Sequence, residues 1–130
     1  MPSAMIPESH RDLLQAPVAV LATRGADGYP QVSALWFVLD GDTLALSLNT
    51  SRQKTKNLRR DPACTLFLLD PATPYRTLEI RARAELRPDT DGRVAAQVQR
   101  KYGADVRRND RPGETRLAVI LHPVKINTWG

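Results

Sequence analysis

The sequence predicts a mainly β protein, built as an antiparallel β-barrel or strongly curled sheet with a few short helices. Three observations indicate this fold class. About six or seven short apolar or alternating runs recur along the chain, residues typical of hairpin turns separate most of them, and helical patterns are few. A parallel α/β fold would need long crossover connections, so hairpin turns favour the antiparallel arrangement. Closing the sheet would also hide its edges.

The first predicted elements are a helix and a hairpin. Residues 8–15 show a short helical pattern, and an apolar strand follows at residues 18–23. The glycine-containing turn at residues 25–28 then leads to a second strand at residues 31–39. Apolar side chains occupy both faces of that strand, so we expect both faces to be at least half buried.

The next elements lead into and out of a strongly basic segment. Residues 40–42 (Asp-Gly-Asp) form a hairpin turn, and the third strand at residues 43–48 places leucines on one face and small or polar residues on the other. The basic residues 50–62 are predicted to form a short helix. A fourth strand at residues 63–69 and an exposed proline-rich loop at residues 70–74 follow.

The last third of the chain contains the clearest strand pattern. Residues 77–86 alternate between apolar side chains and Thr, Glu or Arg, which is typical of a strand with one polar face. A helix is predicted from about residue 88 to residue 102, with Gly103 as its stop. Two short strands, at residues 117–121 and 123–129, complete the prediction.

Length and composition limit the organisation of the protein. At 130 residues, with 42% hydrophobic and 25% charged residues, the chain is expected to form one domain over residues 1–130. No apolar run is long enough for a membrane helix, and residues 1–7 lack a secretory pattern, so we expect a cytoplasmic protein without a membrane partner. Strands with two apolar faces offer more hydrophobic surface than a small barrel needs, which predicts a homodimer packed through barrel strands.

The basic segment 50–62 carries the strongest functional signal. Five cations account for a charge equal to the whole net charge of +5, namely Arg52, Lys54, Lys56, Arg59 and Arg60. A helix start has free N–H groups and the positive end of the helix dipole, so Arg52 and Lys54 in the first turn predict a phosphate-binding site. A solvated basic helix is the alternative. Two Phe, three Tyr and two Trp are too few to favour nucleic-acid binding by stacking.

The sequence contains no evident catalytic triad or metal-ligand cluster. His10 and His122 are distant in sequence, and Cys64 lies in an apolar run where strand packing is the expected role. We therefore predict neither a catalytic side chain nor a metal site.

Several motifs that are weak individually occur in a specific order along nearly the whole chain. They are Val-Leu-Ala-Thr at 20–23, Asp-Gly-Tyr-Pro-Gln-Val-Ser at 27–33, Trp-Phe at 36–37, the basic motif at 54–62, the loop at 70–76 and the closing strand at 123–129. Together they resemble the FMN-binding split β-barrel family, the pyridoxamine 5′-phosphate oxidase-like proteins, and most closely its coenzyme F420-dependent branch.

This resemblance implies a split barrel that dimerises and holds two cofactor sites at the subunit interface. The phosphate-binding positions of relatives correspond to Ser47, Thr50, Ser51, Arg52, Lys54 and Lys56, with Asn57 in support. Positions along the flavin or deazaflavin ring correspond to Gln31, Val32 and Ser33, and a loop position at which the partner subunit often closes over the ring corresponds to Tyr75.

The resemblance also implies an oxidoreductase that transfers a hydride between the deazaflavin coenzyme F420 and a small unsaturated substrate. F420 has a polyglutamate tail beyond its phosphate, and the positive charges of Arg59, Arg60 and Arg76 would attract its carboxylates, which favours F420 over FMN. Two alternatives remain. One alternative to the F420-dependent enzyme is an FMN-dependent oxidoreductase of the same fold. The other is a carrier that binds F420 or flavin without turnover.

Overall fold

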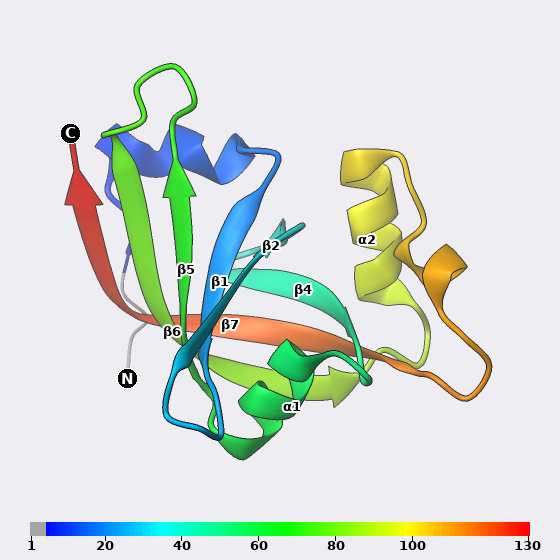
Figure 1. Ribbon diagram of the computed structural model, residues 1–130. Coiled ribbons are helices and arrows are strands. Elements are labelled where there is room, and N and C mark those ends of the chain that lie inside the picture. Colours follow the sequence, from blue (N-terminus) through cyan, green and yellow to red (C-terminus); the bar gives the residue numbers. More distant parts are fainter. Residues whose placement is uncertain (1–4) are drawn as a thin grey trace.

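A computed structural model describes residues 5–130 of the protein and shows a strongly curled sheet (Figure 1). Seven antiparallel strands form the sheet in the order β2-β1-β5-β6-β7-β4-β3. The strands are β1 (Ala19–Arg24), β2 (Pro30–Leu35), β3 (Val38–Asp40), β4 (Thr43–Asn49), β5 (Ala63–Leu69), β6 (Thr77–Pro88) and β7 (Arg116–Trp129). The helices are η1 (Glu8–Gln15), α1 (Gln53–Arg60), α2 (Arg93–Tyr102) and η2 (Val106–Asn109), of which η1 and η2 are 3₁₀ helices. The predicted antiparallel, mainly β fold is confirmed.

The two edge strands of the sheet are neighbours in the chain. β2 ends at Leu35 and β3 begins at Val38, although the two strands lie at opposite ends of the strand order. Three peptide units span at most about 11 Å, so the sheet must curl until its edges approach each other. This connection explains the barrel-like shape in Figure 1.

The single strand predicted at residues 31–39 is wrong, because the chain changes partner within it. β2 pairs with β1, whereas β3 pairs with β4, and Trp36 and Phe37 form the corner between them. A chain that leaves one neighbouring strand to join another must break its ladder of hydrogen bonds. Sequence alternation continues through the corner and does not reveal it.

The prediction that both faces of this strand are half buried is also wrong for β2. Val32 is 61% exposed and Ala34 is exposed, whereas Ser33 and Leu35 on the other face are partly buried. β2 is an edge strand whose outer face is open in the isolated chain. The apolar outer face is therefore available for a contact that the single chain does not make.

Two further boundaries differ from the sequence predictions. Residues 117–121 and 123–129 belong to one continuous strand, β7, in which a register shift against β6 lets Pro123 pair with Ala82 while Lys125 pairs with Arg81. Such a bulge tolerates the missing N–H of proline. The helix predicted from residue 88 begins only at Arg93.

The later start of α2 has a local cause. Gly92 adopts the left-handed conformation with φ of 69°, and the carboxylate of Asp89 accepts hydrogen bonds from the N–H groups of Val94 and Ala95 at 3.2 and 3.0 Å. An acidic side chain that accepts from first-turn N–H groups stabilises a helix start. Asp89 therefore caps α2 from outside the helix.

The apolar core fills the inside of the curled sheet, and α2 packs against its outside. The inward leucines of β4 are Leu44, Leu46 and Leu48, as their alternation predicted. On the opposite face of the sheet, Ala45 and Ile120 pack against Val94 and Val98 of α2. The sheet between β3 and β7 is thus covered on both sides, which places α2 beside the β2–β3 corner.

Cys64 lies in the core, in agreement with its predicted packing role. Burial raises the pKa of the Cys64 thiol to about 12, so the thiol stays protonated at neutral pH. Within residues 5–130 no three His, Cys, Asp or Glu side chains are grouped as a metal site.

The helices of the described chain are too short or too polar to cross a membrane. The prediction that residues 1–7 lack a secretory signal lies partly outside the described residues.

Candidate functional site

The junction between β4 and α1 is held in shape by Asn49. Its Oδ1 accepts hydrogen bonds from the N–H and the hydroxyl of Ser51, at 2.8 and 2.7 Å. The hydroxyl of Thr55 donates to the C=O of Asn49 at 2.8 Å. These contacts make the chain turn sharply and place Arg52 at the start of the helix.

The start of α1 lacks an acidic or hydroxyl cap. The N-cap residue is Arg52, which supplies no acceptor to the helix, and the first turn contains no acidic residue. The first N–H groups of a helix have no intrahelical acceptor and carry the positive end of the helix dipole. An anion from outside the chain would satisfy this helix start.

Lys54 lies beside this helix start and points across to β2. Its Nζ donates to the hydroxyl of Ser33 at 3.0 Å. Burial, and then the neighbouring charge of Arg52, lowers the pKa of Lys54. None of the ion pairs formed within residues 5–130 includes Arg52 or Lys54. The two cations therefore stand together without a carboxylate to neutralise them.

Asn57 fixes α1 against the sheet from below. It is fully buried, and its Nδ2 donates to Thr23 Oγ1 at 3.0 Å and to Gln31 Oε1 at 3.2 Å. Gln53 Nε2 donates to Asn57 Oδ1 at 2.9 Å. This network joins the helix to β1 and β2, so it fixes the position of the helix that carries Lys54 and follows Arg52.

Arg116 holds the segment opposite α1. Its guanidinium donates to both carboxylate oxygens of Asp110, at 2.9 and 2.8 Å, to the C=O of Val106 at 2.7 Å and to the C=O of Ser47 at 3.1 Å. The side chains of Arg116 and Asp110 are only 14% and 17% exposed. Arg116 therefore attaches the η2 segment to β4, together with the hydrogen bond of 2.9 Å from Asn49 Nδ2 to Asp110.

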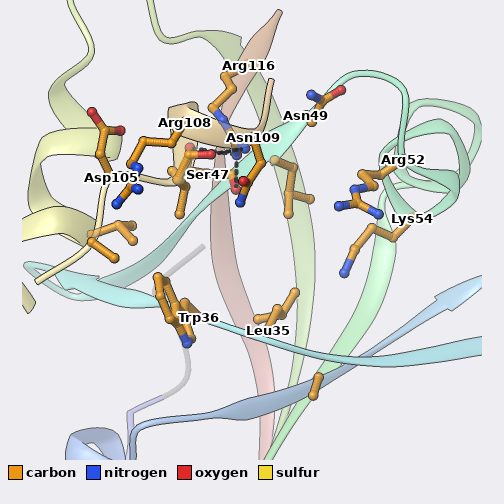
Figure 2. A pocket seen from close by; sticks show the side chains of 15 residues that line it. Leu35, Trp36, Ser47, Asn49, Arg52, Lys54, Asp105, Arg108, Asn109 and Arg116 are labelled. Carbon is orange, nitrogen blue, oxygen red and sulfur yellow. Dashed lines mark hydrogen bonds between the residues drawn. The ribbon is translucent and has the colours of Figure 1, made fainter. Parts of the chain in front are cut away.

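A cleft of about 680 Å³ lies between these two parts of the molecule (Figure 2). Its lining comprises Ala34, Leu35, Trp36, Ser47, Leu48, Asn49, Arg52, Lys54, Val98, Ala104, Asp105, Val106, Arg108, Asn109 and Arg116. Figure 2 shows Arg52 and Lys54 on one side, Arg108 and Asp105 on the other, and Trp36 and Leu35 along one wall. The cleft thus combines an uncompensated positive end with an apolar wall that contains an indole.

The structure brings together part of the predicted site. Ser47, Arg52 and Lys54 line the cleft, and Ser51 and Arg52 line an adjoining cavity of about 300 Å³. Of the predicted ring positions, Ser33 contacts Lys54 and Gln31 contacts Asn57, whereas Val32 faces outward.

Three further predicted residues do not line the cleft. Thr50 pairs with Thr115 at the edge of the junction, and Lys56 is exposed on α1. Tyr75 is 82% exposed on the loop between β5 and β6. In Figure 1 this loop lies at the end of the barrel opposite α1. Within one chain Tyr75 is remote from the cleft.

Sequence reasoning missed the wall formed by η2 and β7. Arg108, Asn109 and Arg116 line the cleft, and the contact between Arg116 and Ser47 joins residues that are 69 positions apart. The only signal in the sequence was the high density of arginine between residues 107 and 116. Nothing in that segment indicates which strand it would meet.

Comparison with known proteins places the chain in a family context. A family model described as pyridoxamine 5′-phosphate oxidase matches residues 6–130. No curated protein matches the chain.

Solved structures with the same fold do not share one named function. A structure named F420 reductase is 33% identical, with 94% of this chain and 98% of that chain covered and a TM-score of 0.80. A conserved hypothetical protein from Mycobacterium tuberculosis is 25% identical, with 98% and 86% covered and a TM-score of 0.77. A heme storage protein from Vibrio cholerae is 19% identical, with 98% and 96% covered and a TM-score of 0.77, and at that identity it shows the fold alone.

Proposed function

The chain belongs to the pyridoxamine 5′-phosphate oxidase family, and we propose that it is an oxidoreductase that uses coenzyme F420 to transfer a hydride to or from a small unsaturated substrate. The observation that carries the proposal is the pair of uncompensated cations, Arg52 and Lys54, at the uncapped start of α1. The 33% identity to an F420 reductase over 94% of the chain supports the choice of cofactor.

The residues of the cleft fit such a cofactor in charge, shape and size. A phosphate requires cationic donors and free N–H groups, which Arg52, Lys54 and the start of α1 provide. A planar ring requires an apolar wall, which Leu35 and Trp36 provide. A volume of about 680 Å³ falls within the usual range for cofactor sites.

Each part of the protein has a defined task in this proposal. The cofactor supplies the ring carbon that carries the hydride. Arg52 and Lys54 hold the phosphate, and Ser33 keeps the ammonium of Lys54 in place. Leu35 and Trp36 orient the ring and exclude water from its surface. Reduction of an unsaturated bond adds a proton as well as a hydride, and reduced F420 would release one of each, so the balance requires no acidic side chain of this chain.

We further propose that two copies associate through the outer face of β1, β2 and β5. The residues that face outward on these strands include Val20, Ala22, Val32, Ala34, Thr65 and Phe67. Of these residues, Val32 on β2 is 61% exposed in the single chain. Ala34 lines the cleft from the same outer face, so a partner that covers this face would also border the cofactor. Tyr75 of one copy would then be available to the site of the other.

Val32→Glu is expected to convert the dimer to a monomer, because it places a charge in the centre of the proposed apolar contact. Light scattering coupled to gel filtration would measure the change, from twice the chain mass to the 14.5 kDa of one chain. Leu39→Glu changes another exposed apolar residue, on β3, and should leave the dimer intact. A wild-type protein that elutes as a monomer would refute the proposed association.

The proposed function is tested by turnover. The protein is incubated with reduced F420 and a panel of enones, quinones and biliverdin-like compounds, and F420 oxidation is followed by absorbance. At least one acceptor should be reduced at a rate proportional to protein concentration. Tight F420 binding with no turnover on any acceptor would indicate a carrier, and tighter binding of FMN than of F420 would indicate an FMN-dependent protein.

A further inference from the structure

The connection between β2 and β3 leaves one buried residue outside the sheet ladder. Phe37 is fully buried and lies between Leu35, the last residue of β2, and Val38, the first residue of β3. A buried backbone N–H or C=O without a partner is strongly unfavourable. Phe37 therefore needs partners from another element.

The last turn of α2 supplies these partners. The N–H of Phe37 donates to the hydroxyl of Tyr102 at 3.2 Å, and that hydroxyl donates to the C=O of Phe37, also at 3.2 Å. The Nζ of Lys101 donates to the same C=O at 2.9 Å and lies 3.8 Å from the centre of the Phe37 ring. Burial raises the pKa of Tyr102, so its hydroxyl keeps the proton that it donates.

The same tyrosine sets the plane of Trp36. The two rings are stacked with centroids 4.4 Å apart and an angle of 4° between their planes. Trp36 also lines the cleft, and Figure 2 shows it at the end away from Arg52 and Lys54. A phosphate held at the start of α1 therefore leaves the Trp36 end of the cleft for the cofactor ring.

We infer that Tyr102 is a positioning residue that orients Trp36 so that the indole contacts the ring of bound deazaflavin. The inference rests on the proposed function. Hydride transfer requires the ring to be fixed to within a fraction of an ångström. The Trp36 indole stacks on Tyr102, and the Tyr102 hydroxyl is hydrogen-bonded to the backbone of Phe37. The indole therefore has little freedom to rotate. The competing account is a structural one, in which Tyr102 only attaches α2 to the barrel.

Two variants of Tyr102 separate these accounts. Tyr102→Leu removes both the stacked ring and the hydroxyl, whereas Tyr102→Phe keeps the ring. For Tyr102→Leu we expect the Kd of F420 to rise about tenfold, as the loss of an aromatic contact implies. The Kd of inorganic phosphate, measured by calorimetry, should change less than about twofold, because phosphate binds at the other end of the cleft. Tyr102→Phe should bind F420 within about threefold of the wild-type protein.

A spectroscopic measurement reports on Trp36 directly. The chain has two tryptophans, so Trp36 is the only one left in a Trp129→Phe background. Binding of F420 should quench its emission by energy transfer. Tyr102→Leu in that background should shift the emission of the free protein to longer wavelength, because one face of the indole becomes exposed.

The results that overturn the inference are distinct. In a folded Tyr102→Leu variant, an unchanged F420 affinity, or equal losses of F420 and phosphate affinity, would show that Tyr102 has no role at the ring. If circular dichroism shows that Tyr102→Leu is unfolded, Trp36→Leu takes its place, because this variant keeps the hydrogen bonds between Tyr102 and Phe37. Trp36→Leu must then lose F420 affinity while it keeps its phosphate affinity. Failure of the proposed function differs from all of these, since the wild-type protein itself would then not bind F420.

Discussion

The Arg52→Ala/Lys54→Ala double variant is expected to bind F420 at least about 100-fold more weakly than the wild-type protein, with its fold intact. Each charge-assisted hydrogen bond to a phosphate contributes about 1.5–3 kcal/mol, so the loss of two corresponds to about 3 kcal/mol or more. Neither side chain takes part in an ion pair within residues 5–130, so their removal leaves no carboxylate without its cationic partner. Titration of F420 fluorescence would measure the affinity, and thermal unfolding would verify the fold.

A matched control separates the local site from the overall charge. Arg11→Ala/Arg100→Ala removes the same amount of positive charge from exposed positions outside the cleft lining. Because charges beyond about 8 Å are screened at physiological salt, this control should change the affinity less than about threefold. Equal losses in the two double variants would mean that net charge, and not the β4–α1 junction, attracts the cofactor.

The Arg116→Ala variant is expected to lose about 3 kcal/mol of stability against unfolding. Removal of one partner from a largely buried ion pair leaves the other charge uncompensated, which costs about 3–5 kcal/mol. Asp110 would keep only the hydrogen bond from Asn49 at 2.9 Å, and the C=O groups of Val106 and Ser47 would lose their donor. Urea denaturation with a fixed slope would measure the change in the free energy of unfolding.

The same segment provides the control for this prediction. Arg107 forms a forked pair with Asp105, at 2.8 and 3.0 Å, but these side chains are 44% and 27% exposed. Exposed ion pairs contribute about 1 kcal/mol or less, so Arg107→Ala should have a small effect. If Arg116→Ala were no more destabilising than Arg107→Ala, Arg116 would not hold the η2 wall of the cleft.

Local features of the sequence were enough to predict most of the fold. The Asp-Gly-Asp turn at residues 40–42 and the alternation at residues 77–86 follow from backbone geometry over a few residues, and both occur as predicted. The corner at Trp36 could not be predicted, because it depends on which strand each half of the segment pairs with. The sequence predicts a separate strand from Pro123, because the bulge that accommodates this proline depends on pairing with β6.

The candidate site, like the fold, could be predicted from the sequence only in part. Arg52 and Lys54 lie close together in the sequence, so the charge pattern and the helix start predict that they act together. The opposite wall, with Arg108 and Arg116, reaches the cleft only through pairing of β7 with β4. The family resemblance implies that Asn57 supports the phosphate site, and its hydrogen bonds to Thr23 and Gln31 show that it holds the helix in position.

The central claim is that a phosphate binds where β4 meets α1, and one comparison of ligands on the unmodified protein tests it most directly. The affinity of F420 is measured beside that of the same deazaflavin without its phosphate and tail, at low and at high salt. We expect F420 to bind at least about 100-fold more tightly at low salt, with a difference that shrinks as salt is raised. Equal affinities for the two ligands at low salt would contradict the claim.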